Sequence, residues 1–287
     1  MGAQAFNHSD GISYYMKNHS VDPTAVVKTL IHNRGLLWEL TKRDFVSRYK
    51  GSVFGLAWSL FNPLLMLAIY TFVFSVAFKA RWGAGNDSQV NFAIVLFSGL
   101  IVHALFAECL MRAPTIIAAN ANYVKKVVFP LEILPLMTMG SALGNFIVSL
   151  VVLMFFCLIS GTFIHPAGLL LPIILLPLLL MTLGLSWFLA SLGVYLRDFA
   201  QVIGMLTTVA LFLAPVFYPI SALPPAYQSL LTLNPITLPV LQVRDALLWG
   251  APLNWVAWAM SLLVSLAVFY LGFAWFQKTR RGFADVL

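Results

Sequence analysis

The sequence from Leu169 to Tyr195 reads LLLPIILLPLLLMTLGLSWFLASLGVY and contains no charged side chain. About 20 apolar residues in a helix are enough to cross the roughly 30 Å of hydrocarbon in a bilayer. Inside hydrocarbon every backbone N–H and C=O needs an internal partner, which leaves α-helices or closed β-barrels. A barrel strand alternates polar and apolar residues, whereas this run is continuously apolar. The stretch therefore predicts a transmembrane helix.

Other stretches of the same kind occur along the chain, and each is long enough to span. They run Val53 to Phe78, Phe92 to Met111, Leu131 to Ile159, Phe199 to Tyr218 and Leu253 to Phe276. We therefore expect an all-α integral membrane protein with six transmembrane helices. Residues 1–52 form an N-terminal arm and residues 53–287 form the transmembrane domain.

The composition also indicates that lipid is the main solvent of this chain. Hydrophobic residues make up 61% and charged residues only 9%, whereas a soluble domain is about 25% charged. The net charge is +7, but the basic residues are dispersed between apolar runs, so we expect no nucleic-acid binding. Cys109 and Cys157 lie inside apolar stretches, which favours simple packing over a disulfide or a metal site.

The distribution of positive charge predicts the orientation, because cytoplasmic loops carry an excess of Lys and Arg. With a cytoplasmic N-terminus, all of the 17 Lys and Arg residues except Lys79, Arg81 and Arg244 lie on the cytoplasmic side. No apolar run precedes Val53, so the arm does not have the pattern of a signal peptide. We expect both termini to be cytoplasmic.

The segment from Leu36 to Lys50 is too charged to span the membrane, yet its pattern is helical. At 100° per residue, an aromatic stripe of Trp38, Phe45 and Tyr49 lies opposite the charged residues Glu39, Arg43 and Lys50. This pattern is typical of an amphipathic helix in the plane of the inner membrane interface. The alternative is a solvated helix in a soluble arm.

The segment from Pro219 to Pro252 is apolar, but prolines at 224, 225, 235 and 239 prevent a helix long enough to cross. Non-helical backbone at membrane depth is tolerated only against protein or a watery cavity. We expect one or two short re-entrant helices in the outer leaflet, between spans five and six, that line or close an exit. The alternative is an external loop that rests on the surface.

Motifs for catalysis are missing from the chain, so we do not expect an enzyme. The sequence has no phosphate-binding G-x-x-x-x-G-K-[ST] loop, no H-E-x-x-H pair and no G-x-S-x-G elbow. Ionisable residues inside the predicted spans are rare. Glu108 and His103 lie in the second span, where charge is costly, and Glu108 is close to the predicted end of that span. An ion-coupled secondary transporter is disfavoured because matched broken helices and further acids are not seen.

Aromatic residues make up 14% of the chain, and aromatic faces suit a sugar polymer that must slide. Lipid contact and helix packing are the competing roles for such residues. The candidate channel-lining residues are Trp58, Phe61, Tyr70, Phe97, Phe106 and Glu108.

A specific resemblance appears in the run RDFVSRYKGSVFGLAWSLFNPLLMLAIYTFVFS, from Arg43 to Ser75. It resembles the start of the membrane subunits of bacterial ATP-binding-cassette exporters for cell-surface polysaccharides, above all the O-antigen exporters. Three further pieces follow in the same order: NYVKKVVFPLEIL (Asn122 to Leu134), YLRDFA (Tyr195 to Ala200) and the segment Ala214 to Ile236, which contains APVFYPISALPP and LNPI. The similarity extends from about Val26 to the end, and the first 25 residues have no counterpart.

The resemblance implies a permease in the bacterial inner membrane that forms a homodimer around a channel and binds two cytosolic ATPase subunits. ATP and Mg²⁺ would be bound by those partners, and no cofactor by this chain. The ATPase-coupling regions map onto Glu39 to Lys50 and Ala113 to Lys126, with the candidate residues Glu39, Arg43, Asn120, Asn122, Tyr123, Lys125 and Lys126. The pair of external gate helices maps onto Ser221 to Leu248. The candidate gate residues are Tyr218, Pro224, Pro225, Tyr227, Asn234 and Pro235.

The cargo implied by the resemblance is a polysaccharide linked to undecaprenyl pyrophosphate. Arg43, Arg48 and Lys50 lie where an anionic pyrophosphate would approach from the inner leaflet. Ordinary headgroup contact is the competing role for these charges. Teichoic acid or capsule export differs chiefly in cargo. A small-molecule exporter of the same fold, a secondary transporter and a membrane-embedded transferase are the other hypotheses.

Overall fold

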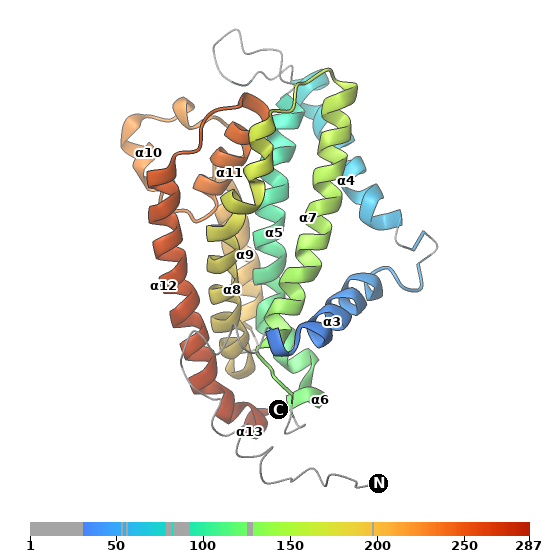
Figure 1. The fold of residues 1–287 in the computed structure, drawn as a ribbon, viewed down its shortest axis with the longest axis vertical. Helices are drawn as coiled ribbons and strands as arrows, with labels where there is room; N and C mark the ends of the chain where they lie inside the picture. Colours follow the sequence, from blue (N-terminus) through green and yellow to red (C-terminus); the bar gives the residue numbers. More distant parts are fainter. Residues whose placement is uncertain are drawn as a thin grey trace, which may run out of the picture.

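The computed structural model describes residues 31–52, 54–55, 57–78, 82, 92–124, 129–196 and 198–287. All regular secondary structure within these ranges is helical, so the all-α prediction is confirmed for them. The long helices run side by side, with short helices at both ends (Figure 1). One end carries α3, α6 and the C-terminus and is called the α3 end. The opposite end carries α10 and is called the α10 end (Figure 1).

Five segments of the described chain are long and apolar enough to cross a membrane. They are Ala57–Phe74, Phe92–Ala119, Ile133–Ile159, Pro166–Tyr195 and Trp255–Val286. The first contains α4 (Ala57–Tyr70) and part of the π-helix η1 (Thr71–Ala77), and the second and third are α5 and α7. The fourth joins the short η2 (Pro166–Leu170) to α8 (Leu171–Tyr195). The last joins α12 (Trp255–Thr279) to η5 (Arg280–Gly282) and α13 (Phe283–Val286).

The predicted span from Phe199 to Tyr218 is shorter than expected. Its helix, α9, covers only Phe199–Leu213, and Ala214 is already extended with φ −88° and ψ 150°. Pro215 follows, and a proline pushes the preceding residue out of the helical region. A helix of 15 residues rises about 22 Å, less than the hydrocarbon thickness. The helix that was predicted to reach Tyr218 therefore ends at Leu213, and six membrane-spanning helices stay a prediction.

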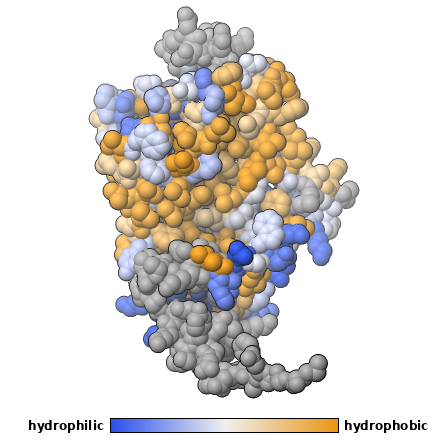
Figure 2. Space-filling view, viewed as in Figure 1, coloured by the Kyte–Doolittle hydropathy of each residue, from blue (hydrophilic) through white to orange (hydrophobic). Residues whose placement is uncertain are grey.

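Helix α5 is the centre of the bundle, and α4 lies at its edge. In the membrane-spanning window of α5, 72% of residues are buried, against 6% in the window of α4. Helix α8 packs between α5 and α12, and Gly184 allows the close contact with α12. A Cβ at Gly184 would lie 2.5 Å from the carbonyl oxygen of Val268. The apolar outer side of the bundle is visible in Figure 2.

Helix α3 (Arg34–Ser47) slants away from the lower part of α7 (Figure 1). Two residues of the predicted aromatic stripe, Phe45 and Tyr49, contact α7, but Trp38 is 65% exposed, and the buried residue of this helix is Leu40, at 5% exposure. The partner helix explains the difference. Gly140 and Gly144 of α7 leave room for the side chains of Thr41 and Phe45.

Short helices occupy the segment between α9 and α12, as the prolines predicted. They are η3 (Ile220–Ala222), α10 (Pro225–Leu231), α11 (Thr237–Arg244) and the π-helix η4 (Asp245–Trp249). Val240 and Val243 of α11 are fully buried, whereas Tyr227 and Leu230 of α10 are exposed. Helix α11 is thus part of the packed core, and the depth of α10 and α11 in a bilayer stays a prediction.

Candidate coupling site

A cluster of charged residues joins α3 to α5 at the α3 end. Asp44 of α3 accepts hydrogen bonds from Arg112 of α5, at 2.9 Å from Nη1 and 2.6 Å from Nη2. Arg48, one turn after Asp44, donates to the same carboxylate at 3.2 Å and pairs with Glu108 of α5. The cluster is electrically balanced, since two carboxylates face two guanidinium groups. A bidentate Arg–carboxylate pair fixes direction as well as distance, so it holds the two helices in one relative orientation.

Polar side chains extend the charged cluster onto α7. Asn145 of α7 donates to Oε2 of Glu108 at 3.0 Å, and Tyr49 donates to Oδ1 of Asn145 at 3.2 Å. The predicted second span ended at Met111, but α5 continues to Ala119. Glu108 therefore lies well inside the helix rather than near its end, and charges from α3 neutralise it there.

The charged cluster lowers the pKa of Asp44. Burial by itself raises the pKa of this carboxyl, but the hydrogen bonds and positive charge of Arg112 act in the opposite direction and are assisted by Ser141 and Arg48. The net result is a pKa below the ordinary value. Asp44 is therefore ionised at neutral pH, as a permanent ion pair requires.

The connector between α5 and α7 is held at both of its described sides. Arg43 of α3 donates to the hydroxyl of Tyr123 at 2.9 Å. The Tyr123 ring stacks on Phe129 with 4.3 Å between centroids and 10° between planes. Arg280 of the C-terminal segment donates to the Phe129 carbonyl at 3.0 Å and to Glu132 at 2.7 Å. Helix α3, the connector and the C-terminal segment are thus linked by direct side-chain contacts.

The predicted coupling residues fall into three groups. Arg43 and Tyr123 are brought together, and Asn120 uses its amide to cap α5 by donating to the Ile116 carbonyl at 2.8 Å. Glu39 and Asn122 are exposed. Lys125 and Lys126 lie outside the described residues. The region predicted as a loop from Ala113 is helical up to Ala119 and again in α6 (Ala121–Val124). The connector is therefore shorter than the sequence indicated.

A groove of about 330 Å³ lies between α3 and the last turns of α5. Its lining includes Arg43, Asp44, Ser47 and Arg112, together with Asn120 at its edge. Both the ion pair and the arginine that holds the connector thus border one open groove. A partner that entered this groove would contact α3, α5 and the connector together.

The predicted channel-lining residues do not form one surface in the single chain. Phe97 and Phe106 are 3% and 4% exposed and belong to the packed core, so a channel-lining role for them is not supported. Phe61 is exposed and its ring contacts Trp58 with 5.2 Å between centroids, and Tyr70 is half-buried beside Phe74. His103 lies 3.0 Å from the Thr207 carbonyl of α9 and has no part in the charged cluster.

The predicted gate residues at the α10 end have mainly structural contacts. Tyr218 donates to the Phe212 carbonyl at 2.9 Å, and Asn234 donates to the Ala210 carbonyl at 2.7 Å. Both bonds hold the chain against the end of α9. Pro224 and Pro225 start α10, Pro235 precedes α11, and Tyr227 points outward with 59% exposure.

Arg244 is the residue at this end whose importance sequence reasoning missed. It is completely buried. It donates to the carbonyls of Val95, Pro215 and Val216 at 2.9, 2.5 and 2.9 Å, and its guanidinium lies 4.5 Å from the centroid of the Trp82 ring. The sequence did contain an indication of this role, because an arginine in the apolar run VRDALLW needs hydrogen-bond acceptors inside the protein when it is buried. Two of its carbonyl partners, Pro215 and Val216, follow the end of α9, and the third, Val95, lies in α5, so only the folded chain brings them beside α11.

Comparison with known proteins shows the family of this chain. The sequence pattern of the family described as ABC-2 type transporter matches residues 35–248, which include α3, the charged cluster and α11. The chain belongs to the ABC-2 type transporter family.

Curated relatives of this ABC-2 chain are named "O-antigen export system permease protein RfbA". One, from Klebsiella pneumoniae, is 27% identical over 89% of this chain and 98% of its own length. Another, from Myxococcus xanthus, is 28% identical over 91% of this chain and 98% of its own length. The relatives thus align over nearly their whole length.

Proposed function

We propose that this chain is the membrane subunit of an ATP-driven exporter that moves lipid-linked O-antigen polysaccharide across the bacterial inner membrane. Two copies would form the channel, and two cytosolic ATPase subunits would supply the energy and bind ATP and Mg²⁺. The family and the names of the relatives support this proposal. In this proposal the α3 end, which carries the C-terminus, faces the cytoplasm, and both termini are cytoplasmic, as the distribution of Lys and Arg predicts.

The observation that carries the proposal is the linkage of α3 to the most buried helix of the bundle. Helix α3 lies outside the bundle, yet Asp44 is fixed to Arg112 of α5 by two hydrogen bonds. Arg43 ties the same helix to the connector through Tyr123. If an ATPase displaced α3 or the connector, these hydrogen bonds would therefore move α5 together with them. Coupling of this kind requires an element with two arrangements that the partner can bias.

The second copy is proposed to cover the apolar face of α4. In the single chain this helix exposes Phe61, Leu64, Leu65 and Met66. Lipid and a second protomer would both shield these apolar side chains from water, so the hydrophobic effect does not distinguish between them. The export role in the relatives' names favours a second protomer, because a seam between two copies can form a passage for a sugar chain. Aromatic side chains at the seam, such as Phe61, would then face the polymer.

The residues predicted to contact the pyrophosphate differ in whether their charge is already paired within the chain. Arg48 is held by Asp44 and Glu108, so its charge is already balanced. Lys50 is exposed beyond the end of α3, and Arg43 is exposed with one bond to Tyr123. We propose that Lys50 and Arg43, rather than Arg48, approach an anionic lipid pyrophosphate. Lys50→Gln is then expected to slow export while ATPase assembly is retained, and unchanged export would remove this role.

The proposed function is tested by deletion and complementation. Loss of the gene should remove polymer from the cell surface and cause lipid-linked polymer to accumulate in the cytoplasm. The wild-type chain should restore export only together with an ATPase whose phosphate-binding loop is intact. Normal surface polymer in the deletion strain would overturn the proposal.

Complementation together with transport in liposomes separates the alternatives. Teichoic acid or capsule export would show the same dependence on the ATPase with a different accumulating polymer. A secondary transporter would move cargo in liposomes under a proton or sodium gradient without the ATPase. A transferase would yield no accumulating intermediate of full length.

A further inference from the structure

We propose that Arg280 is a positioning residue that transmits movement of the connector between α5 and α7 to the paired helices α8 and α12. The inference rests on the proposed function, in which an ATPase displaces this connector. Arg280 lies in the C-terminal segment, residues 280–287, and its partners are about 150 positions earlier in the chain. It therefore joins the end of the chain to a region that the ATPase is proposed to contact.

The C-terminal segment is packed against the bundle. Phe283 of α13 is fully buried, and its ring lies 5.6 Å from the ring of Phe276 in α12 and 6.2 Å from that of Tyr195 in α8, measured between centroids. A Cβ at Gly282 would lie 2.6 Å from the hydroxyl oxygen of Tyr195, so the backbone also approaches α8 closely. The end of the chain is therefore part of the folded core, and it holds Arg280 in one place.

Arg280 fastens the chain just before α7. Its Nη1 donates to Oε2 of Glu132 at 2.7 Å, and its Nη2 donates to the Phe129 carbonyl at 3.0 Å. The side chains of Arg280 and Glu132 are only 16% and 9% exposed, so little water competes for this charge-assisted bond. Trp187 of α8 donates from Nε1 to the backbone carbonyl of the same Glu132 at 3.1 Å. The start of α7 is thus bound to α8 and to the segment after α12 at once.

The other side of the connector is reached from α3. Arg43 donates to the hydroxyl of Tyr123, and the Tyr123 ring stacks on Phe129 with 4.3 Å between centroids. Phe129 is therefore contacted on its ring by Tyr123 and on its carbonyl by Arg280. Coupling between distant sites is carried by such chains of packed side chains and hydrogen bonds. A displacement of Tyr123 would be passed to Arg280 through Phe129.

Helices α8 and α12 are joined along their length and form one unit. Near the α3 end, the Tyr195 hydroxyl donates to the Thr279 carbonyl at 3.1 Å. In the middle, Gly184 brings the two backbones into contact. Near the α10 end, Trp258 donates from Nε1 to the Ile173 carbonyl at 2.8 Å. Movement of the C-terminal segment should therefore displace both helices together, as a rigid body.

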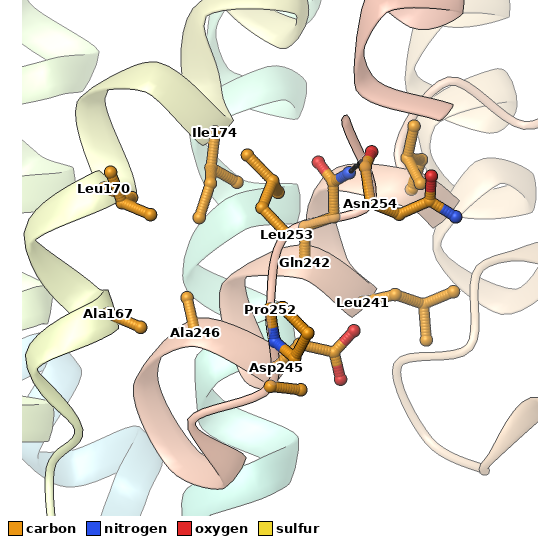
Figure 3. A pocket seen from close by; sticks show the side chains of 12 residues that line it. Ala167, Leu170, Ile174, Leu241, Gln242, Asp245, Ala246, Pro252, Leu253 and Asn254 are labelled. Carbon is orange, nitrogen blue, oxygen red and sulfur yellow. Dashed lines mark hydrogen bonds between the residues drawn. The ribbon is translucent and has the colours of Figure 1, made fainter. Parts of the chain in front are cut away.

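The α10 end of this helix pair borders a pocket of about 200 Å³. Figure 3 shows Ala167 and Leu170 of η2 on one side of the pocket and Leu241 of α11 and Asp245 of η4 on the other. A close-packed interior leaves little room for one element to move against another, whereas a pocket provides it. The pair therefore has free space beside α11, at the opposite end of the molecule from Arg280.

The transport test compares variants of the full-length chain, reconstituted in liposomes with its ATPase and with lipid-linked O-antigen from the strain that makes this protein. Polymer transported and ATP hydrolysed are measured in the same samples. We expect Arg280→Gln to assemble and to hydrolyse ATP, but to move about fivefold less polymer per ATP. Arg280→Lys keeps the charge beside Glu132 without the planar fork, so it should lie between Arg280→Gln and wild type. Arg281→Gln, at the exposed neighbouring position, is the matched control and should equal wild type.

Hydrogen exchange of the same assemblies tests the contact itself. Loss of the two bonds should speed exchange of the backbone amides of residues 131–134 in Arg280→Gln and leave it unchanged in Arg281→Gln. Exchange in Arg280→Gln that matches wild type, or equal polymer per ATP in the two proteins, would overturn the inference. A parallel loss of folded protein, ATP hydrolysis and transport in both Arg280→Gln and Arg280→Lys would also overturn it, because Arg280 would then serve folding alone.

Failure of this inference and failure of the proposed function give different results. If wild type moves polymer and Arg280→Gln moves the same amount per ATP, the coupling role of Arg280 is rejected while the exporter function stands. If wild type with its ATPase moves no polymer, the proposed function fails and the coupling role fails with it.

Discussion

Asp44 in α3 accepts hydrogen bonds from both terminal nitrogens of Arg112 in α5, at 2.9 and 2.6 Å. The pair joins residues that are 68 positions apart and lie in two helices that differ in burial. Helix α3 lies outside the bundle, whereas α5 is its most buried spanning helix. The guanidinium fork fixes the angle between the two partners, which a single contact cannot do. Movement of α3 is therefore expected to act on α5 directly.

Arg112→Lys should weaken this link while the positive charge is kept. A lysine cannot form the two parallel hydrogen bonds, so we expect the free energy of unfolding to fall by about 1–2 kcal/mol. Export should fall more strongly than the amount of folded protein in the membrane. SDS titration in mixed micelles measures the first effect and surface polymer the second. Arg281→Lys, at an exposed position of the same end, is the control and should change neither.

The pH dependence of stability should reveal Asp44. Its pKa is lowered in the folded chain, since the hydrogen bonds and charge of Arg112 outweigh the opposing effect of burial. A lowered pKa contributes stability that is present above the unfolded value of about 4 and is lost as the pH falls through the folded value. The difference in melting temperature between wild type and Asp44→Asn should therefore be large at pH 7 and shrink below pH 4. A constant difference down to pH 3 would contradict the ion pair.

Arg43→Gln and Tyr123→Phe remove the two sides of one hydrogen bond, and Arg43→Gln should reduce export at least as much as Tyr123→Phe, because it also removes the charge that is proposed to approach the pyrophosphate. We expect ATP hydrolysis by the assembled exporter to continue while export drops. The double variant should be no worse than Arg43→Gln alone, as expected if the Tyr123 hydroxyl acts through Arg43. Reconstituted transporter provides both rates. Additive losses in the double variant would show that the two residues act separately.

Arg244→Gln should destabilise the α10 end by several kcal/mol. The substitution leaves at least one of three buried carbonyls without its donor and removes the cation beside Trp82. Limited proteolysis between α9 and α11 should become faster, whereas the α3 end should keep its protection. Arg34→Gln, an exposed arginine of α3, is the matched control. Protection of the α9–α11 segment that does not change in Arg244→Gln would refute the proposed clamp.

Gly184→Ala should separate α8 from α12. The added Cβ would lie 2.5 Å from the Val268 carbonyl oxygen and 2.6 Å from the Phe269 Cα, which are backbone atoms that cannot turn aside. We expect a loss of about 2 kcal/mol or more in the free energy of unfolding. Gly204→Ala in α9 meets nothing within 4 Å, so the same chemical change there should be neutral or slightly stabilising.

Several features of this protein could be read from the chain alone because they depend on local composition. Long apolar runs have no way to satisfy their backbone in lipid except as helices, so the helical class and most spans followed from them. Proline positions predicted the short helices between α9 and α12. Pro215 also carried the information that α9 stops early, and counting apolar residues alone overlooked it.

Helix faces and partners could not be predicted in the same way, because they depend on neighbours. Trp38, Phe45 and Tyr49 share a stripe by periodicity, yet only Phe45 and Tyr49 contact α7 while Trp38 stays exposed, because Gly140 and Gly144 of α7 leave room for Thr41 and Phe45. Phe97 and Phe106 are aromatic, as expected of residues that line a channel for sugars, but α5 lies at the centre of the bundle and buries them. In lipid, no face of an apolar helix is favoured over another, so packing against neighbouring helices decides which face is buried.

The sequence by itself determined that this protein is a helical membrane protein with the family pattern of an ABC-2 transporter, since apolar length and local motifs are properties of contiguous residues. Only the tertiary structure decided that Asp44 meets Arg112, that Glu108 is neutralised inside α5, and that Asp245 faces a pocket while Arg244 faces carbonyls. The physical reason is that charges buried in an apolar bundle are stable only beside particular partners, and those partners are brought together by packing across distant segments.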